Sequence, residues 1–305
     1  MLLTKVMSET VNPGSLRLRN LISKNGTFAA PGVFSASTAL IAKEAGFECM
    51  YFSGAAFSNL LGLPDLGVTT LTEITDAVGK IVSKVDLPLI VDADTGFGEA
   101  VNVSRTVNEL EKAGAAAIHI EDQVMPKKCG HLSGKEIVPP EEMMKKIIAA
   151  KQAAGTDLVI IARTDAAAVE GLDGTIKRSK LYIKAGADMI FPDALETKEQ
   201  FLRFSKEVPV PLIANMTEFG KTPYFTVKQF SEMHYKFVLF PVTAFRAAMK
   251  AVEKTFNQIA KKGTQEDILK ELMTRKEFYE LSDYYSYERL DREIARKAKR
   301  LTSAN

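Results

Sequence analysis

The sequence predicts an α/β protein, a (β/α)8 barrel of the TIM type with additional C-terminal helices. Short apolar runs alternate with longer amphipathic stretches, and polar residues stand where the apolar runs end. A parallel strand that is buried on both faces requires near-continuous hydrophobicity, which these runs have. The eight runs cover residues 28–34, 49–54, 88–94, 116–122, 158–165, 189–194, 211–216 and 236–241.

The stretches between the runs are interpreted as helices. Three of them end in AGF, AGA and AGA at residues 45–47, 113–115 and 185–187. Glycine at such a position accepts the left-handed conformation that is common just after a helix. Eight alternating strand and helix units favour a closed barrel. A doubly wound open sheet is the alternative, but no G-x-G-x-x-G motif follows the first run.

The pattern changes after residue 262. Residues 1–262 are predicted to form the catalytic barrel with an N-terminal helical lead-in, and residues 263–305 a helical extension. Apolar residues in the extension recur every three or four positions, which indicates an amphipathic helix that packs on its own barrel or on a neighbouring subunit. We expect the subunit interface. The stripe consists of Tyr287, Leu290, Ile294, Ala298 and Leu301.

Composition excludes several functional classes. The 305 residues carry a net charge of +2 with both signs interspersed, so nucleic acid is not an expected partner. Two cysteines do not make a disulfide scaffold and fit a reducing cytoplasm. No apolar run approaches the roughly 20 residues that span a bilayer. The first 20 residues lack the features of a signal peptide, so we expect a soluble cytoplasmic protein.

Polar residues follow six of the predicted strands at their C-terminal ends. The active site of a barrel lies at that end, built by the loops between strands and helices. A charged residue there is costly unless it faces the site. We therefore expect these side chains to surround an active site. They are Ser53, Asp92, Asp94, Glu121, Asp122, Arg163, Asp165, Asp193 and Asn215.

A metal site is predicted from "VDADTGFG", which places Asp92 and Asp94 two residues apart. The period of a strand sends both carboxylates to one face. Two such charges repel each other without a cation, and oxygen ligands suit Mg²⁺ or Mn²⁺. Glu121 could add a third acidic group. The alternative is that one carboxylate caps a helix and the other pairs with a basic residue.

Cys129 lies in "KKCGHLSGKEIVP", a glycine-containing loop, and not in an apolar run. Lys127, Lys128, Lys135 and His131 surround it in the sequence, which favours a thiolate and a reactive cysteine. The glycines would let the loop move over the barrel mouth, as catalytic lids do. Cys49, by contrast, is interpreted as a core residue, and His119 as a packed, hydrogen-bonded side chain.

Substrate oxygens are expected to be held by Arg163, Asn215, Arg246 and Arg275. Guanidinium groups bind carboxylates with two parallel hydrogen bonds, so several of them indicate a polyanionic small molecule. Arg163 is the strongest candidate because it ends the fifth strand. Arg275 could equally be a surface charge.

Five segments together resemble the isocitrate lyase/phosphoenolpyruvate mutase superfamily and, within it, the 2-methylisocitrate lyase family. The segments are "VDADTGFG", "IEDQVMPKKCGH", "ARTDA", "ANMTEFG" and "FPVTAFR", and the likeness extends from "SGAAFSNLLGLPDLG" to "TRKEFYE". It implies Mg²⁺-dependent cleavage of 2-methylisocitrate to pyruvate and succinate, with Mn²⁺ as a substitute metal, by a homotetramer.

Isocitrate lyase, which forms glyoxylate, is the nearest alternative, but it is usually much longer. A phosphonate-forming mutase and a barrel that only binds a dicarboxylate are weaker alternatives.

The resemblance also implies a role for each matching residue. Asp92 and Asp94 match the metal positions, with Glu121 and Asp65 acting through water. Cys129 protonates the succinate carbanion, His131 lies beside it, and Tyr51 is the base for the hydroxyl group. A glycine is more usual at Ala55, and a glutamate at Asp193. The substrate contacts are Ser53, Gly54, Ala55, Gly130, Arg163, Asp193, Asn215, Thr217, Arg246 and Arg275.

Overall fold

The computed structural model describes residues 13–155 and 157–303. The first twelve residues, which carry much of the predicted lead-in and of the signal-peptide argument, lie outside the described residues. The chain forms two compact units, Met1–Arg246 and Ala247–Asn305. The predicted functional boundary after residue 262 stays a prediction.

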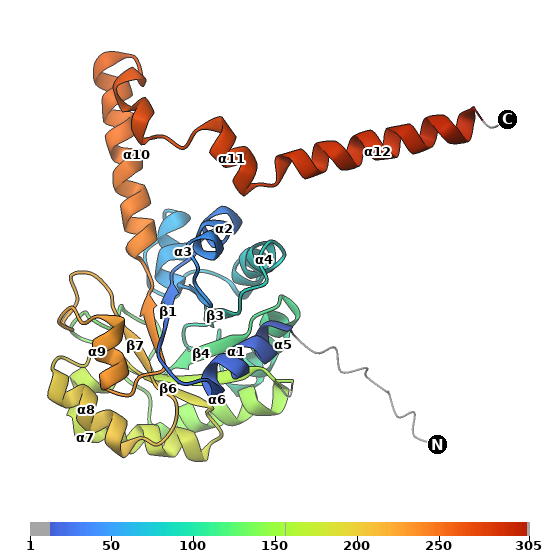
Figure 1. Ribbon diagram of the computed structural model, residues 1–305. Coiled ribbons are helices and arrows are strands. Elements are labelled where there is room, and N and C mark those ends of the chain that lie inside the picture. The colour runs from blue at the N-terminus through green and yellow to red at the C-terminus, as the bar shows by residue number, and fades with distance from the viewer. Residues whose placement is uncertain (1–12, 156, 304–305) are drawn as a thin grey trace, which may run out of the picture. The chain divides into compact units, whose positions relative to one another are not determined.

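The first unit is a closed barrel of eight parallel strands, as predicted (Figure 1). Hydrogen-bonded pairing gives the orders β1-β8-β7 and β2-β3-β4-β5-β6. Parallel bridges between Gly32 and Tyr51 and between Ile190 and Leu212 join the two arcs. The strands are β1 (Phe28–Pro31), β2 (Met50–Phe52), β3 (Leu89–Asp92), β4 (Ala117–Glu121), β5 (Val159–Thr164), β6 (Met189–Pro192), β7 (Ile213–Asn215) and β8 (Phe237–Phe240).

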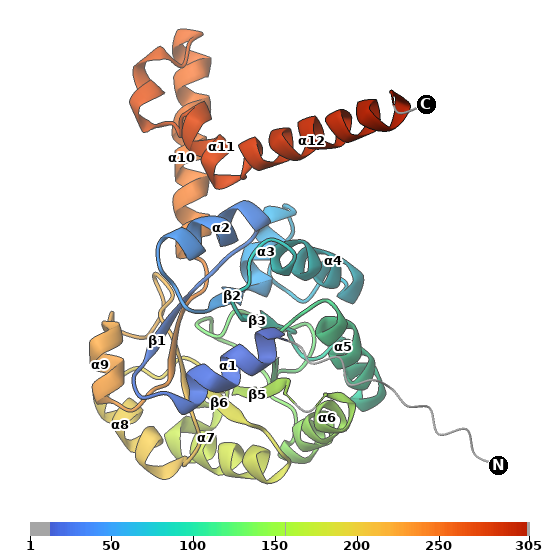
Figure 2. The ribbon, with the colours of Figure 1, turned by 45° about the vertical axis from the view of Figure 1, so that its right-hand side comes forward.

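Helices surround the strands on the outside of the barrel (Figure 2). The connections that contain α2 to α9 return the chain to the start of the next parallel strand. Several begin with a capping box, for example at Thr70 and Thr226. The helices of this unit are α1 (Pro13–Ser23), α2 (Ala36–Glu44), α3 (Gly54–Leu60), α4 (Leu71–Val82), α5 (Ala100–Lys112), α6 (Pro140–Ala153), α7 (Ala167–Lys184), α8 (Lys198–Glu207) and α9 (Val227–Glu232).

Alternate residues along each strand fill the barrel interior. On β5, Val159 and Ile161 belong to the inner core, whereas Ile160 belongs to the core between strands and helices. Leu18 of α1 also contacts the inner core, and Arg19 donates hydrogen bonds to the carbonyl groups of Asp157 and Leu158 at 2.7 and 3.0 Å. Helix α1 therefore covers the N-terminal end of the barrel, which leaves the C-terminal end open.

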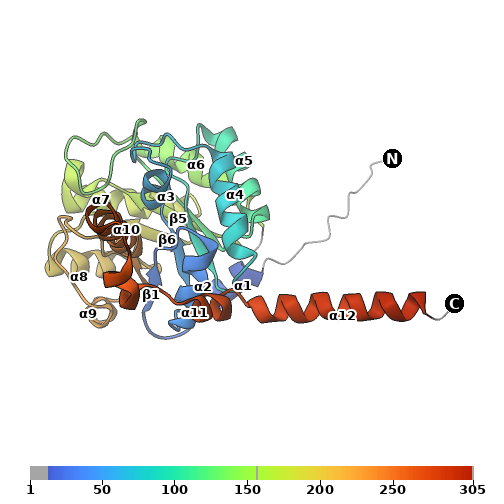
Figure 3. The same ribbon diagram turned by 90° about the horizontal axis from the view of Figure 1, so that it is seen from above.

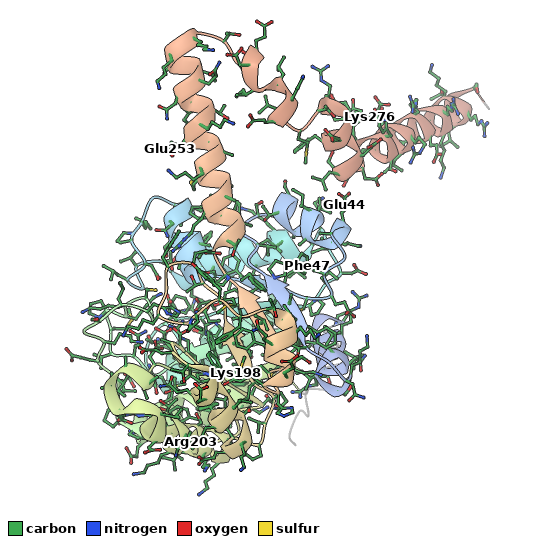
Figure 4. All side chains as sticks on the ribbon, turned by 60° about the vertical axis from the view of Figure 1, so that its left-hand side comes forward. Glu44, Phe47, Lys198, Arg203, Glu253 and Lys276 are labelled. Atoms are coloured by element: carbon green, nitrogen blue, oxygen red, sulfur yellow. The ribbon has the colours of Figure 1, made fainter. Side chains whose placement is uncertain are left out.

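The outer surface of the barrel carries ordinary solvated ion pairs. Arg203 of α8, labelled in Figure 4, pairs with Asp173 at 2.6 Å and with Glu207 at 2.9 Å. Pairs of this kind contribute little to stability, because water screens them. The buried charged residues lie instead at the C-terminal ends of the strands.

The second unit contains most of α10 (Thr243–Lys262), the short 3₁₀ helix η1 (Glu266–Glu271), α11 (Arg275–Leu281) and α12 (Tyr284–Thr302). Lys254 of α10 pairs with Glu271 at 2.6 Å, and the rings of Tyr279 and Tyr284 stack with centroids 4.2 Å apart. Helix α12 is straight and has no buried residue (Figure 3). Among the described residues, no helix has the length and hydrophobicity needed to cross a membrane.

Candidate active site

A cavity of about 240 Å³ opens at the C-terminal end of the barrel strands. It is lined by residues from strands and from the loops that follow them, as the fold class predicts. The structure brings most of the predicted residues together in its wall. These are Tyr51, Ser53, Ala55, Asp65, Asp92, Cys129, Gly130, His131, Arg163, Asp193, Asn215, Thr217 and Arg246.

Four predicted residues are not in that wall. Asp94 and Glu121 lie directly behind it, each in an ion pair with a residue that lines the cavity. The backbone N–H of Gly54 donates to Asp92 Oδ2 at 3.1 Å, so Gly54 supports the site from the start of α3. Arg275 begins α11 in the other compact unit, and its predicted substrate contact stays a prediction.

Lys127 connects the acidic residues on one side of the cavity. Its ammonium group pairs with Asp94 Oδ1 at 2.9 Å and with Asp65 Oδ1. Its side chain is 4% exposed, so water screens these pairs weakly. Asp94 lies just beyond the end of β3 in a left-handed conformation, with φ of 46°, and its N–H donates to Asp92 Oδ1 at 3.1 Å. The two aspartates therefore converge, as predicted.

The protonation of these carboxylates is shaped by burial and by their mutual repulsion. Burial, then the charge of Asp92, raises the pKa of Asp94 to about 6, although Lys127 opposes this. Burial also tends to raise the pKa of Asp92. The charges of His119, Lys127 and Arg163 outweigh it and lower this pKa to about 2. Burial raises the pKa of Glu121 well above its usual range.

The residues present fit a divalent cation. Around the cavity, ion pairs and hydrogen bonds link the carboxylates to fewer permanent cations: Asp65, Asp92, Asp94, Glu121, Asp165 and Asp193 lie beside Lys127, Lys135 and Arg163. Oε1 of Glu121 is buried with no hydrogen-bond partner among the described residues, whereas Oε2 of Glu121 and Oδ1 of Asp94 are buried and contact Arg163 and Lys127, respectively, as ion pairs. Within the described ranges, no three acidic, imidazole or thiol side chains cluster as ready metal ligands. Mg²⁺ suits such a site, because it usually keeps several waters and takes one or two carboxylates.

Arg163, at the end of β5, is the central cation of the opposite side. Its guanidinium group lies 3.1 Å from Glu121 Oε2, 3.0 Å from Asp165 Oδ2 and 2.9 Å from Asp193 Oδ2. The arginine also lies over the ring of Phe191, 5.3 Å from its centroid. Contacts on several sides fix the orientation of the guanidinium group, so a carboxylate of a ligand would meet it in one geometry.

Asp193 links Arg163 to His131. Asn215 Nδ2 donates to Asp193 Oδ1 at 3.0 Å, and His131 Nε2 lies 3.7 Å from the same oxygen. The backbone N–H of Lys221 donates to His131 Nδ1 at 3.0 Å, which leaves the ring proton on Nε2 when the ring is neutral. Burial lowers the pKa of His131, so it is neutral near pH 7.

Cys129 lines the cavity with its thiol protonated. Burial raises the pKa of this thiol, and the hydrogen bond from the backbone of His131 opposes the rise. The expectation that the loop lysines favour the thiolate is wrong, because each lysine has another partner. Lys127 pairs with Asp65 and Asp94, Lys128 donates to the carbonyl of Gly134 at 2.8 Å, and Lys135 pairs with Asp165.

Tyr51, which lines the cavity, meets His119 inside the barrel. The Tyr51 hydroxyl group lies 2.8 Å from His119 Nε2 and 3.4 Å from Asp92 Oδ2. The predicted packed and hydrogen-bonded role of His119 is confirmed, since the ring is fully buried. Burial, then the charge of Asp92, raises the pKa of Tyr51 well above its ordinary value. Its phenol is therefore protonated near pH 7 and can donate a hydrogen bond.

Arg246 occupies the rim of the cavity. It donates to the backbone carbonyl of Glu218 at 3.0 Å and lies over the ring of Phe219, 5.2 Å from the centroid. Its side chain is 45% exposed, so it remains accessible to a ligand. Thr217 lies on the same β7–α9 connection and lines the cavity.

The sequence did not indicate the supporting roles of three buried residues, Gln123, Lys127 and Lys135, although the two lysines were noted beside Cys129. All three belong to the segment between β4 and α6 and are buried. A signal was present, because the sequence places three lysines in one short loop beside several acidic strand ends. Which lysine pairs with which carboxylate depends on the conformation of the loop.

Comparisons with known proteins agree with this geometry. The model of the phosphoenolpyruvate phosphomutase family matches residues 18–260. The 2-methylisocitrate lyase of Aeropyrum pernix is 57% identical over 289 residues, 95% of this chain and 93% of the relative. The crystal structure of 2,3-dimethylmalate lyase, a member of the PEP mutase/isocitrate lyase superfamily, has a TM-score of 0.86 at 32% identity and covers 93% of this chain and 95% of its own. A phosphonopyruvate hydrolase in complex with oxalate and Mg²⁺ has a TM-score of 0.83 at 32% identity, covering 91% and 98%. The chain belongs to the 2-methylisocitrate lyase family of this superfamily.

Proposed function

We propose that this protein cleaves 2-methylisocitrate into pyruvate and succinate, and that Cys129 supplies the proton that completes succinate. One observation carries the proposal. A half-buried thiol with a raised pKa faces the same cavity as the Asp92–Asp94 carboxylate pair and an arginine held by three carboxylates. A site that only bound a dicarboxylate would need the arginine and the cation but not the thiol.

The proposed metal is Mg²⁺, with Mn²⁺ as a substitute. Asp92 and Asp94 would hold it, and Glu121 and Asp65 would reach it through water. Bound there, the cation would polarise the hydroxyl and carboxylate oxygens of the carbon that becomes the pyruvate carbonyl. The ammonium group of Lys127 lies against two of these carboxylates, so it also balances their charge.

Substrate carboxylates are held by groups around the rest of the wall. Arg163 and Asn215 meet the ligand from the strand ends, Arg246 from the rim, and Ser53 and Ala55 from the start of α3. Binding by charge-assisted hydrogen bonds on several sides fixes the carbon–carbon bond to be broken relative to Cys129. In this proposal Arg275 adds a further contact.

The proposed reaction moves two protons, one from the substrate hydroxyl and one from the Cys129 thiol. The substrate hydroxyl gives its proton to solvent water, the bond between its carbon and the neighbouring carbon breaks, and the bonding electrons collect on the succinate half next to a carboxylate; the proton that the thiolate later regains from water makes the cycle neutral in protons. Cys129 donates its thiol proton to that carbon, which yields succinate and a thiolate. The thiolate recovers a proton before the next turnover. Because the phenol of Tyr51 is protonated near pH 7, we assign it hydrogen bonding to the substrate oxygen and not proton removal.

Apolar groups near the cavity give the proposed pocket for the substrate methyl group. Phe191, Leu239 and Pro241 line the cavity. Phe191 is 1% exposed and its ring packs against the guanidinium group of Arg163, so the apolar part of the cavity adjoins the arginine. A methyl group in such a pocket favours 2-methylisocitrate over isocitrate, which lacks it.

A direct assay tests the function. Purified protein with Mg²⁺ receives 2-methylisocitrate or isocitrate in parallel, and pyruvate, glyoxylate and succinate are measured. We expect pyruvate and succinate in equal amounts from the first substrate. If glyoxylate formed with the higher kcat/KM, the protein would be an isocitrate lyase. Binding of both acids without any product would make it a sensor or carrier.

The functional assembly in this proposal is a homo-oligomer, a tetramer, located in the cytoplasm. Leu290, Ile294 and Leu301 of α12 are 55%, 59% and 67% exposed, and an apolar stripe of this kind favours packing against another protein surface. Truncation after Gly263 is expected to lower the mass measured by light scattering at micromolar concentration. A monomeric mass for the full chain would contradict the proposal.

A further inference from the structure

The loop that carries Cys129 is held on both sides of the cysteine. On the preceding side, the side-chain amide of Gln123 makes two hydrogen bonds with the backbone of Lys128. Its Nε2 donates to the Lys128 carbonyl at 2.8 Å, and its Oε1 accepts from the Lys128 N–H at 2.9 Å. The two hydrogen bonds hold the N–H of one peptide group and the C=O of the next, and neither group can rotate without leaving a part-buried polar group unpaired, which is costly. The residue before Cys129 is therefore fixed in orientation.

On the following side, Lys135 holds the backbone of Gly130. The Lys135 ammonium group donates to the carbonyl oxygen of Gly130 and to Asp165 Oδ1, the latter at 2.9 Å. The side chains of Lys135 and Asp165 have no exposed surface. A buried ammonium group that loses its carboxylate is strongly unfavourable, so Lys135 has little freedom to leave this position.

Gly130 also allows little sideways movement. A Cβ atom at this position would lie 1.6 Å from Asp193 Oδ2 and 2.8 Å from Arg163 NH2. The backbone of Gly130 therefore rests directly on the ion pair that Arg163 and Asp193 form at 2.9 Å. Cys129 stands between two tethered peptide groups, one of which also packs against the anion-binding groups.

Asp165 connects this tether to the wall of the cavity. Its Oδ1 accepts from both Lys135 at 2.9 Å and Arg163 NH2 at 3.2 Å, and its Oδ2 accepts from Arg163 Nε at 3.0 Å. Its own N–H donates to Asp122 Oδ1 at 2.9 Å. One carboxylate on β5's C-terminal end thus orients the arginine and, through Lys135, the peptide group after the cysteine.

We propose that Gln123 and Lys135 are positioning residues that fix the thiol of Cys129 for proton transfer, with Asp165 tying that position to Arg163. This inference rests on the proposed role of Cys129 as the proton donor. Neither residue lines the cavity, so neither touches the substrate. Their effect is expected on the chemical step and not on substrate affinity, because a displacement of about 1 Å can lower a rate by about 100-fold.

Four single variants test the proposal: Lys135→Met, Gln123→Met, the charge-keeping Lys135→Arg and, as the matched control, Glu136→Gln. Methionine matches the length of the glutamine side chain, is one atom shorter than lysine, and removes the hydrogen bonds, whereas Glu136 adjoins Lys135 but its side chain is exposed. Each variant is assayed for kcat and KM with 2-methylisocitrate and Mg²⁺. In parallel, alkylation of Cys129 by iodoacetamide is timed without substrate, with the modified cysteine identified by mass spectrometry.

We expect Lys135→Met and Gln123→Met to lower kcat by about 10- to 100-fold with a much smaller change in KM. Alkylation of Cys129 should accelerate, because the released loop exposes the thiol. Lys135→Arg, which keeps the charge, should recover part of both properties. Glu136→Gln should match the wild type. A residue that only stabilised the fold would change the melting temperature and leave the split between kcat and KM unmoved.

Unchanged kcat and unchanged alkylation in both methionine variants would overturn the inference. So would a rise in KM at constant kcat, which would place the two residues in substrate binding. Should Lys135→Met fail to fold, Gln123→Met decides alone, because it removes no buried charge. The alkylation rate needs no turnover, so it tests the tethers even if the wild type does not cleave 2-methylisocitrate. In that case the proposed function fails and the positioning of the thiol is still decided.

Discussion

The strand ends of the barrel and the loop between β4 and α6 build the same cavity by different means. Arg163 and Asp193 project from adjacent strands whose backbones pair residue by residue, and their ion pair spans only 2.9 Å. The loop has no such ladder beyond the single bridge between Gln123 and Ile137. Its conformation depends on side-chain contacts, among them those of Lys127 and Lys135.

This difference separates the groups that bind the substrate from the group that is proposed to donate the proton. The groups proposed to bind the substrate carboxylates, such as Arg163, lie at the strand ends, where neighbouring charged side chains fix their orientation. The proposed proton donor lies on the loop, where burial keeps its thiol protonated. A rigid frame therefore positions the ligand, and a segment with few backbone hydrogen bonds delivers the proton. The predictions below separate these two contributions.

The largest effect is expected on the loop. Cys129→Ser should lower kcat by about 100- to 10,000-fold, because a serine hydroxyl is far too weak an acid for the proposed step. Substrate binding, measured by calorimetry, should change little, since the strand ends supply it. Cys49→Ala is the control, because Cys49 is buried in the inner core. A Cys129→Ser variant that keeps more than about a tenth of wild-type kcat would exclude Cys129 as the donor.

On the strand ends, removal of the metal should be almost as damaging. EDTA should abolish activity, and Mg²⁺ or Mn²⁺ should restore it. Asp94→Ala should lose roughly 100-fold or more in kcat/KM and should bind Mn²⁺ more weakly in a titration without substrate. Asp76→Ala, at an exposed aspartate of α4 that pairs with Lys80, should behave as the wild type. Full activity after exhaustive chelation would contradict a metal site at Asp92 and Asp94.

The same division explains what the sequence could and could not predict. All eight strands were found, and the run at 158–165 became β5 at Val159–Thr164, because burial on both faces leaves a clear apolar signal. Arg163 and Asn215 were assigned to the site because they end predicted strands, where the active site of a barrel lies. The partner of each lysine was not predictable. Lys127 reaches Asp65 across 62 positions, and such a contact depends on the folded path of the loop.

A smaller effect should come from the apolar part of the strand ends. If Phe191, Leu239 and Pro241 enclose the substrate methyl group, the loss of that methyl costs about 1–3 kcal/mol, or roughly 10- to 200-fold in kcat/KM. We therefore expect a clear preference for 2-methylisocitrate with slow cleavage of isocitrate. Leu239→Ala, which enlarges the pocket, should narrow the preference without affecting Mg²⁺ dependence. Equal kcat/KM values for both acids in the wild type would contradict the proposal that these residues form a methyl pocket.

The smallest expected effect is a shift in the pH dependence of Cys129 alkylation, which reports the loop alone. A thiol with a raised pKa stays protonated over a wider pH range, so its reactive thiolate forms only at higher pH. Since burial raises the pKa of Cys129, the inflection of the alkylation rate should lie above the value of about 8.5 for an unperturbed cysteine. The urea-unfolded chain provides that ordinary inflection in the same sample series.

Lys128 sharpens this last test, because it is the loop lysine whose ammonium group is not held by a carboxylate in the described contacts. If the lysines stabilised a thiolate, Lys128→Met would move the inflection to higher pH. We expect no such shift, since its ammonium group is bound to the carbonyl of Gly134 and the thiol is governed by burial. An inflection below that of the unfolded chain would mean that the folded loop stabilises the thiolate. Cys129 would then be a poor proton donor at neutral pH, and the contrast between rigid binding groups and a protonated loop acid would fail.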